Sequence, residues 1–236
     1  MSERKRAHNE DDSDDANSEI SRPPLTRSHK IERDDDKKFN LLLILTGSVA
    51  VIKAPELIQK LYQRCGEDKI IIKVVATENA FKMLNSQKLE IDELIYLDMD
   101  EWNMWRERGD PVLHIGKICE LRKWADAMLI SPLDANTMAK IANGICDNLV
   151  TSVIRAWDFE KPVYFAPAMN TYMWENPLTV GHRNTLKSIL QFKEICPISK
   201  ELMCGDKGLG AMADTETISS LISALVRDQL AVRSRH

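Results

Sequence analysis

The sequence predicts an α/β protein, a three-layer sandwich of the Rossmann-like and flavodoxin-like type, in which helices cover both faces of a parallel sheet. Short runs of leucine and β-branched residues alternate along the chain with helical patterns of apolar residues. These runs lack the apolar-polar alternation of a half-exposed strand, as expected for strands buried on both faces. Strands that alternate with helices join through right-handed crossovers into one parallel sheet.

Five strands and seven helices are expected in this alternation. The predicted strands are residues 41–45, 70–76, 128–130, 163–166 and 195–198. The predicted helices are residues 52–65, 80–85, 118–125, 137–143, 149–157, 177–190 and 217–229. The spacing of these elements shows no internal repeat and suits a single domain, which we expect over residues 39–230.

Residues 1–38 differ from the rest and are expected to form a disordered charged tail. They carry 11 acidic and 9 basic side chains, few large apolar ones, and Pro23-Pro24 in the middle. Such a segment cannot bury enough apolar surface to offset the entropy lost on ordering. Arg4-Lys5-Arg6 could act as a nuclear-localisation patch, although a charge cluster in a solvated tail usually has no specific role.

Composition and charge exclude several classes of protein. The net charge of −4 lacks the basic excess that nucleic-acid binding uses, so no nucleic-acid partner is expected. The apolar stretch from Leu41 ends at Thr46, well short of the ~20 residues needed to span a membrane. The N-terminus lacks the apolar region of a secretory signal, so we expect a cytoplasmic protein, with the nucleus as an alternative. Five cysteines without a Cys-x-x-Cys pair predict neither a disulfide framework nor a metal site.

Polar and small residues follow four of the predicted strands. The loops are residues 46–49, 77–79, 131–137 and 166–170. In an open α/β sheet, ligands bind beyond the carboxyl ends of the strands, so these loops are expected to converge. Backbone N–H groups at helix starts can bind a phosphate. Each loop alone is more simply interpreted as a helix N-cap, but four loops at one edge favour a ligand site.

The glycine pattern narrows the kind of ligand. The first loop has the single glycine Gly47, and the chain has neither Gly-x-Gly-x-x-Gly nor the Gly-x-x-x-x-Gly-Lys-Ser/Thr phosphate loop. A mononucleotide is therefore favoured over a dinucleotide or a magnesium-bound triphosphate. Met169, Met173 and Trp174 could form apolar walls for a planar ring, although residues of this kind are more often plain core.

Four motifs resemble those of the flavin-dependent cysteine decarboxylase family. Residues 46–50, Thr-Gly-Ser-Val-Ala, are similar to its first flavin loop, and residues 132–137 to its Pro-x-x-Ala-Asn-Thr motif. Residues 167–174 resemble its Pro-x-Met-Asn-x-x-Met-Trp substrate-recognition motif, and residues 203–212 its substrate flap. The resemblance covers most of residues 40–225 in the right order, with features of the eukaryotic coenzyme A branch rather than the peptide-modifying branch.

The resemblance implies a cofactor, a reaction and an assembly. The implied cofactor is FMN, and the implied reaction is the decarboxylation of 4′-phospho-N-pantothenoylcysteine to 4′-phosphopantetheine in coenzyme A biosynthesis. A protein with this activity is a carboxy-lyase, which is the enzyme class we expect. The substrate thiol is oxidised to a thioaldehyde, carbon dioxide leaves, and the enethiolate is reduced again. Family members are homotrimers with FMN at the subunit interface. The implied FMN contacts are Gly47, Ser48, Val49, Ala76, Thr77, Glu78, Asp134, Ala135, Asn136, Thr137 and Ala168.

The resemblance also assigns the catalytic roles. His114 is the expected acid or base, and Cys204 is the expected proton donor for the final reduction. Asn170 is expected to bind the substrate carboxylate through its amide, and could cap a helix as well. The remaining candidates for substrate contacts are Met173, Met203, Lys53 and Arg122, of which Lys53 and Arg122 would meet the substrate phosphate. His114 stands a few residues further from the Leu121-Arg122 helix than the family pattern has it.

One alternative function belongs to another class. Some relatives of this fold are non-catalytic flavoprotein subunits of the protein-phosphatase-inhibitor type and carry acidic extensions, and this chain begins with an acidic segment. Such relatives tend to lack one of the active residues. His114, Asn170 and Cys204 are all present here, which favours the enzyme. A flavin storage or prenylation protein is disfavoured by the Met-Cys-Gly-Asp flap.

Overall fold

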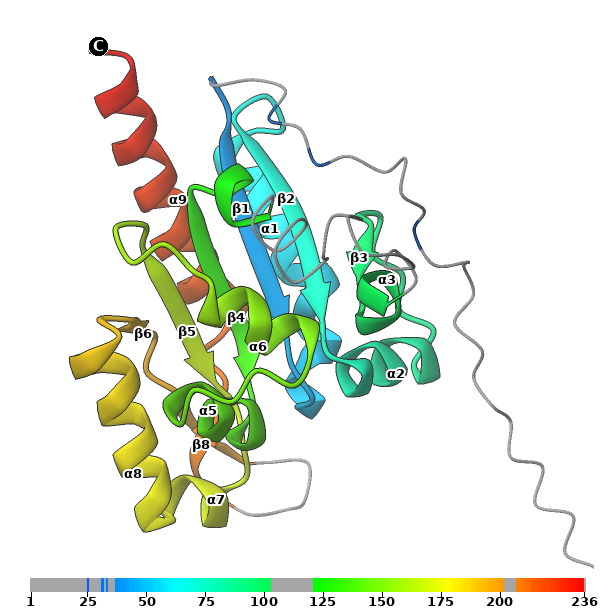
Figure 1. The fold of residues 1–236 in the computed structure, drawn as a ribbon, viewed down its shortest axis with the longest axis vertical. Coiled ribbons are helices and arrows are strands. Elements are labelled where there is room, and N and C mark those ends of the chain that lie inside the picture. The colour runs from blue at the N-terminus through cyan, green and yellow to red at the C-terminus, as the bar shows by residue number, and fades with distance from the viewer. Residues whose placement is uncertain are drawn as a thin grey trace, which may run out of the picture.

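The structure is a computed structural model that describes Leu25, Ile31, Arg33 and residues 37–102, 121–201 and 207–235. Its centre is a parallel sheet whose strands are β1 (Phe39–Leu45), β2 (Ile70–Ala76), β3 (Ile95–Tyr96), β4 (Ala127–Leu133), β5 (Val163–Pro167) and β6 (Lys193–Glu194). The strand order is β3-β2-β1-β4-β5-β6, and every pairing is parallel (Figure 1). The predicted parallel α/β sheet is therefore confirmed.

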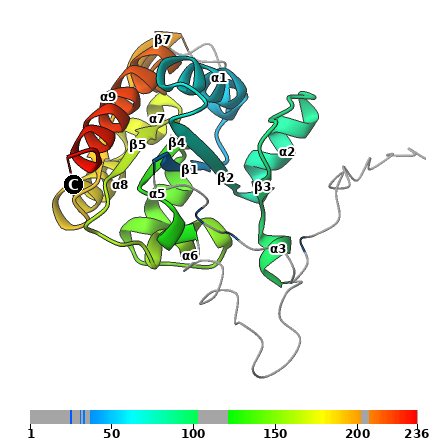
Figure 2. The same cartoon turned by 90° about the horizontal axis from the view of Figure 1, so that it is seen from above.

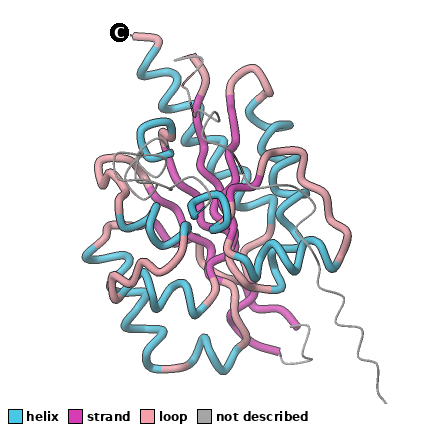
Figure 3. Tube along the Cα trace, turned by 45° about the vertical axis from the view of Figure 1, so that its right-hand side comes forward, coloured by secondary structure: helices cyan, strands magenta, loops and turns pink. Residues whose placement is uncertain are grey.

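Helices cover both faces of this sheet, as predicted (Figures 2 and 3). The helical elements are η1 (Val49–Lys53), α1 (Ala54–Cys65), α2 (Glu78–Ser86), α3 (Asp98–Trp102), α5 (Ala135–Ala142), α6 (Leu149–Arg155), α7 (Thr171–Glu175), α8 (Pro177–Asn184), η2 (Thr185–Ile189) and α9 (Thr215–Arg233). Helices α1, α2 and α9 pack on one face, and α5, α6 and η2 on the other. Within the described residues, no helix is both long and apolar enough to cross a bilayer.

Strand β1 shows why the central strands lack alternation. Leu41, Leu43 and Leu45 belong to a first core cluster beneath α1 and α9, whereas Leu42 and Ile44 belong to a second core cluster beneath α5 and α6. All five side chains are fully buried. Each face of the strand therefore needs apolar residues, and burial of each side chain contributes about 1.5–3 kcal/mol relative to exposure.

The short elements differ most from the sequence-based expectation. The fifth strand, expected at residues 195–198, is wrong in position, since β6 pairs with β5 through Tyr164 and Lys193 two residues earlier. Residues 198–201 instead form β7 (Ile198–Glu201), which pairs antiparallel with β8 (Lys207–Ala211). Pro197 lacks an N–H donor and separates the two strands. The other predicted helices agree with the structure within a few residues, whereas α3 and α7 were not predicted. Of the helix expected at residues 118–125, only residues 121–124 are described as helix.

Part of the expected tail contacts the domain. The backbone N of Leu25 donates a 2.8 Å hydrogen bond to Asp100 Oδ1, and Ile31 is 8% exposed in the second core cluster. Arg33 Nη1 lies 3.0 Å from Asp126 Oδ1. These three residues, which lie in the segment expected to be a tail, therefore contact the folded domain. Two isolated apolar residues among many charges gave no periodic signal.

Asp126 joins three separate parts of the chain at the start of β4. Its Oδ2 accepts a 2.8 Å hydrogen bond from the backbone N of Asn40, the second residue of β1. Its carboxylate also pairs with Arg33 and with Arg233, near the end of α9. The Asp126 side chain is largely buried, so these donors replace the water it has lost.

Replacing this carboxylate should therefore weaken the whole domain. Asp126→Ala leaves the Asn40 N–H without its acceptor and removes the carboxylate with which Arg33 and Arg233 pair. We expect the free energy of unfolding to fall by about 1–3 kcal/mol, measured by urea denaturation. Asp228→Ala, at an exposed position of α9, is the matched control and is expected to change it by less than about 0.5 kcal/mol. Equal stability of the two variants would contradict the role given to Asp126.

Candidate active site

The four polar loops lie along one edge of the sheet. Strands β2, β1, β4 and β5 are successive neighbours and parallel, so their carboxyl ends lie side by side. Along this edge the strand order reverses at β1, with β2 and β3 on one side and β4 to β6 on the other. Such a switch point is where open α/β sheets form a ligand crevice. The predicted convergence of the loops is thus present in the structure.

Each loop contains a side chain that caps the helix after it. Ser48 accepts from the backbone N of Ala50, Thr77 from that of Ala80, and Asp134 from that of Thr137. Asn170 caps α7 in the same way. The N-cap interpretation is therefore correct for all four residues. Capping does not compete with ligand binding, because the cap satisfies only one of the several unpaired N–H groups in the first turn of a helix.

Thr46 joins the first loop to the third. Its fully buried hydroxyl donates to the carbonyl oxygen of Pro132 at 2.9 Å and accepts from the backbone N of Asp134 at 2.8 Å. The backbone N of Thr77 donates to the carbonyl of Leu45 at 3.0 Å, which ties the second loop to the same strand end. Three loops are thus fixed to one another. The sequence predicts a loop position for Thr46 but gives no sign of this bridging role.

Gly47 lies where these three loops meet. A Cβ atom at Gly47 would lie 3.0 Å from Asn79 Cβ, in the second loop, and 3.4 Å from Asp134 Oδ2, in the third. The absence of a side chain at Gly47 therefore leaves room for the side chains of Asn79 and Asp134 beside the first loop. Ala76 and Ala168, also predicted contacts, are buried and small. These three residues accordingly place no bulky side chain at this edge.

The helix starts supply donors for an anionic group. Helix α5 has no acidic residue in its first turn, and Asp134 caps only the N–H of Thr137, at 2.8 Å. In α2 the Glu78 carboxylate is paired with Lys82 Nζ at 2.9 Å. Unpaired N–H groups and the positive ends of the helix dipoles favour a phosphate at such a position.

Asn170 is placed to use both halves of its amide. Its Oδ1 accepts a 2.8 Å hydrogen bond from the backbone N of Met173, and the residue is exposed. Because the cap uses the carbonyl oxygen, the amide nitrogen keeps its two hydrogens for an external acceptor. The predicted cap is confirmed, and the cap leaves the amide nitrogen for the carboxylate that Asn170 is expected to bind.

The hairpin of β7 and β8 is attached to this same loop. The backbone N of Met169 donates a 2.9 Å hydrogen bond to the carbonyl of Gly210. Gly210 has a φ of +128°, and a Cβ atom there would lie 2.5 Å from the carbonyl oxygen of Met169. Only glycine permits this approach. The glycine at position 210, in the sequence Gly-Leu-Gly, is the feature of the sequence that could have indicated this close contact with Met169.

The structure does not bring all the predicted site residues together. His114, Met203 and Cys204 lie outside the described residues. Arg122 lies at the opposite edge of the sheet, where its carbonyl accepts from Lys161 Nζ at 2.7 Å, just before β5 begins. Seven-residue strands separate the two edges by about 20 Å, so within one chain Arg122 does not reach the loops.

The remaining candidates lie at or near the loops. Lys53 ends η1 and precedes α1. Met173 is exposed on α7, whereas Met169 is buried in the second core cluster, and Trp174 packs against that cluster. The simpler interpretation of Met169 and Trp174 as core residues is therefore correct.

Asp98 is an acidic residue at this edge that the sequence analysis missed. It follows β3, and its Oδ1 accepts a 2.7 Å hydrogen bond from the backbone N of Leu149, at the start of α6. Burial raises the pKa of the Asp98 carboxyl, and the carboxylates of Glu78 and Asp147 act in the same direction. Its local role is to join α3 to α6 beside the ligand edge.

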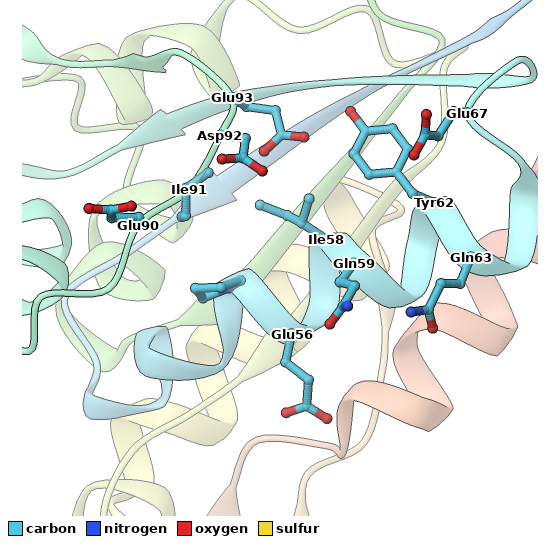
Figure 4. A pocket seen from close by; sticks show the side chains of 11 residues that line it. Glu56, Ile58, Gln59, Tyr62, Gln63, Glu67, Glu90, Ile91, Asp92 and Glu93 are labelled. Atoms are coloured by element: carbon cyan, nitrogen blue, oxygen red, sulfur yellow. The ribbon is translucent and has the colours of Figure 1, made fainter.

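A cavity of 630 Å³ elsewhere in the molecule is not this site. It lies between α1 and residues 90–93 (Figure 4). Its lining includes five carboxylates, those of Glu56, Glu67, Glu90, Asp92 and Glu93. Such a surface repels phosphates and carboxylates, and none of the predicted site residues lines it.

The fold and the loop geometry together define a nucleotide-binding α/β protein, and comparison with known proteins specifies its family. The family model described as Flavoprotein matches residues 29–227. The chain is 50% identical over 192 residues to phosphopantothenoylcysteine decarboxylase of Mus musculus, which covers 81% of this chain and 89% of the mouse protein.

Solved structures give the same result. A cysteine-to-serine mutant of PPC decarboxylase, complexed with pantothenoylaminoethenethiol, matches with a TM-score of 0.71 and 44% identity over 80% of this chain and 98% of that chain. The FMN binding protein AtHal3 matches with a TM-score of 0.67 and 45% identity over 80% of this chain and 96% of that chain. The chain therefore belongs to the flavoprotein family and, within it, to the group that contains the phosphopantothenoylcysteine decarboxylases.

The Thr46 bridge generates a test of how the edge is held together. Thr46→Val keeps the shape of the side chain but leaves the Asp134 N–H and the Pro132 carbonyl unpaired in a buried place. We expect a loss of about 1–3 kcal/mol in the free energy of unfolding, measured by urea denaturation. The control is Thr185→Val, whose hydroxyl bonds the Gly181 carbonyl at an exposed position, with a change below about 0.5 kcal/mol. An unchanged Thr46→Val variant would show that the bridge is dispensable.

Proposed function

We propose that this chain catalyses the FMN-dependent decarboxylation of 4′-phospho-N-pantothenoylcysteine to 4′-phosphopantetheine, a step of coenzyme A biosynthesis. One observation carries the proposal: Asn170 caps α7 through its carbonyl oxygen and keeps its amide nitrogen available at the carboxyl edge of the sheet. That position stands in the Pro-x-Met-Asn-x-x-Met-Trp sequence of residues 167–174. The 50% identity to the mouse decarboxylase supports the same substrate.

The residues of the ligand edge fit FMN. A Cβ atom at Gly47 would crowd the side chains of Asn79 and Asp134, so a larger residue would disturb the loops where FMN is proposed to bind. Ser48, Thr77 and the first turn of α5, from Ala135 to Thr137, would hold its polar groups, with Ala76 and Ala168 as small neighbours. When bound, FMN supplies a two-electron acceptor that oxidises the cysteinyl group of the substrate and later returns the electrons.

The chain's own contribution is to bind and orient the substrate. Asn170 would hold the substrate carboxylate through a neutral N–H donor, which positions the group without the strong stabilisation of its charge that a lysine or arginine would give. The expected roles of His114 as acid or base and of Cys204 as proton donor remain part of the proposal. Both residues are present in the sequence and lie outside the described part of the chain.

A homotrimer with FMN at the subunit interface is the proposed assembly. Exposed apolar side chains gather beside the ligand edge, namely Val49 and Ile52 on η1 and Tyr172, Met173 and Leu178 on α7 and α8. Apolar surface of this kind next to a site supports an interface between copies of the chain. In a trimer, Arg122 of one copy could serve the site of another. Light scattering on the purified protein is expected to give three chains per particle.

The alternative function and the location can be tested together with the activity. The purified full chain is expected to be yellow from oxidised flavin and to release carbon dioxide from 4′-phospho-N-pantothenoylcysteine. Bound flavin without any carbon dioxide release would favour the non-catalytic regulatory subunit. Release of carbon dioxide by a colourless protein would contradict the cofactor. The proposed cytoplasmic location is to be checked by microscopy of the tagged chain.

Cofactor binding should depend on the space at Gly47. Gly47→Val places a branched side chain against Asn79 and Asp134, so we expect the flavin bound per chain to fall by about tenfold or more, equivalent to at least ~1.4 kcal/mol. The visible absorbance of the purified protein measures this content. Gly181→Val is the control, because a Cβ atom at Gly181 meets nothing within 4 Å. Full flavin content in Gly47→Val would place the cofactor elsewhere.

Turnover should depend on the amide nitrogen of Asn170. Asn170→Asp retains the cap, since aspartate is as good an N-cap, but presents a negative oxygen to the substrate carboxylate. We expect carbon dioxide release to fall by about a hundredfold, equivalent to roughly 3 kcal/mol, while flavin content and stability stay close to wild type. Asn176→Asp makes the same exchange at the cap of α8 and should leave activity within about twofold. Equal rates for the two variants would remove Asn170 from the mechanism.

A further inference from the structure

Helix α7 carries the substrate-recognition residues but is weakly anchored by its own burial. It has five residues, none of them fully buried. Tyr172 is 74% exposed and Met173 is 51% exposed, whereas Trp174 is half-buried and packs against the second core cluster. Because a short helix is held mainly by tertiary contacts, the orientation of α7 depends on how Trp174 is held.

Trp174 is held by a cation from the next helix. The Arg183 Cζ atom of α8 lies 4.2 Å from the centroid of the Trp174 ring. This distance is well within the range of a cation–π contact, for which a planar guanidinium over an indole is the most favourable pair. From β8, a Cβ atom at Gly210 would lie 3.3 Å from Trp174 Cβ. Trp174 is therefore confined between α8 and β8.

The guanidinium of Arg183 is itself fixed by Glu194. Arg183 Nε lies 2.6 Å from Glu194 Oε1, and Arg183 Nη2 lies 2.9 Å from Glu194 Oε2. The Glu194 side chain is only 6% exposed, at the end of β6. Two parallel hydrogen bonds define the plane of a guanidinium, which a single contact cannot do. The sheet edge thus sets the orientation of the group that stacks on Trp174.

We propose that Arg183 is a positioning residue for substrate recognition. Bound to Glu194 and stacked on Trp174, it holds α7 and thereby Asn170, whose backbone carbonyl oxygen accepts a 2.9 Å hydrogen bond from the backbone N of Trp174. The proposal rests on the proposed function, since Asn170 is taken to bind the substrate carboxylate. Arg183 touches neither that carboxylate nor the cofactor in this account and acts through Trp174 alone.

Lys187 offers a matched control for this role. Its Nζ lies 3.2 Å from Glu194 Oε2, so it shares the carboxylate partner of Arg183. In the described part of the chain, the cation that stacks on the Trp174 ring is Arg183 and not Lys187. Removing either residue weakens the ion pairs of Glu194, but only a change at Arg183 alters the contact with Trp174.

The first experiment compares Arg183→Lys with Lys187→Gln in the flavin-loaded enzyme. Lysine keeps a positive charge near Glu194 but loses the planar stacking and the paired hydrogen bonds. We expect Arg183→Lys to raise the KM for 4′-phospho-N-pantothenoylcysteine by about three- to tenfold, with kcat changed less and the flavin spectrum unchanged. Lys187→Gln is expected to keep KM within about twofold of wild type. A wild-type KM in Arg183→Lys would overturn the proposal.

A second pair of variants tests whether Arg183 acts through Trp174. Trp174→Phe keeps a ring for the cation, whereas Trp174→Leu removes it, so the KM should rise less in the former. In the Trp174→Leu background, Arg183→Lys should raise KM no further, because the contact is already lost. Additive effects of the two substitutions would contradict an action through Trp174.

Amide hydrogen exchange tests the positioning role of Arg183 independently of enzyme activity. Exchange in the peptide covering residues 170–176 should be about three- to tenfold faster in Arg183→Lys and unchanged in Lys187→Gln. If the wild type releases no carbon dioxide while this exchange difference is found, the proposed function fails and the positioning contact stands. If wild-type turnover is normal and the exchange difference is absent, the positioning role fails and the proposed function stands.

Discussion

The burial of β1 on both faces is the constraint on which the rest of the molecule depends. A strand with leucine or isoleucine side chains packed above and below requires a helix layer on each side and a paired neighbour at each edge. Parallel pairing with β2 and β4 then brings three strand ends to one level. Thr46, the first residue after β1, uses its hydroxyl to join the adjoining loops. The ligand edge is thus a consequence of how the core is built.

The same backbone positions serve folding and ligand binding at this edge. A helix that begins directly after a buried strand has N–H groups without intrahelical partners, and its cap satisfies only one of them. Ser48, Thr77, Asp134 and Asn170 each supply such a cap, and the donors that remain are available to phosphate or carboxylate oxygens. Asn170 shows this double use most clearly, since its side-chain oxygen caps α7 and its amide nitrogen remains available to a ligand.

The main strands and the four loops that follow them could be predicted from the sequence, because each rests on a local pattern. A run such as Leu41 to Leu45 is readable without knowing its neighbours, and so are the polar residues that follow it. The two-residue strands β3 and β6 gave no such pattern, because their pairing is decided by the strands beside them. The contacts of Leu25 and Ile31 with the domain could not be predicted for a related reason. A single apolar residue among charged residues forms no periodic pattern.

Contacts between distant segments set the remaining limit on sequence-based prediction. Arg122 and Lys53 look alike as cations near apolar helices, yet the fold places Arg122 at the amino edge of the sheet and Lys53 beside the loops. The stacking of Arg183 on Trp174 joins residues whose spacing across α7 and α8 follows no helical period. Thr46 likewise needs Pro132 and Asp134, 86 and 88 positions away, before its role becomes visible.

The anchoring of α9 has a consequence for how this chain can be extended. Arg233 reaches Asp126 and the carbonyl of Lys38 at the amino edge, and Figure 1 shows the C-terminus at the far end of the molecule from α7 and β8. A domain or purification tag appended after α9 would therefore emerge on the side remote from the four loops of the candidate active site. Fusion at this end would leave those loops unobstructed.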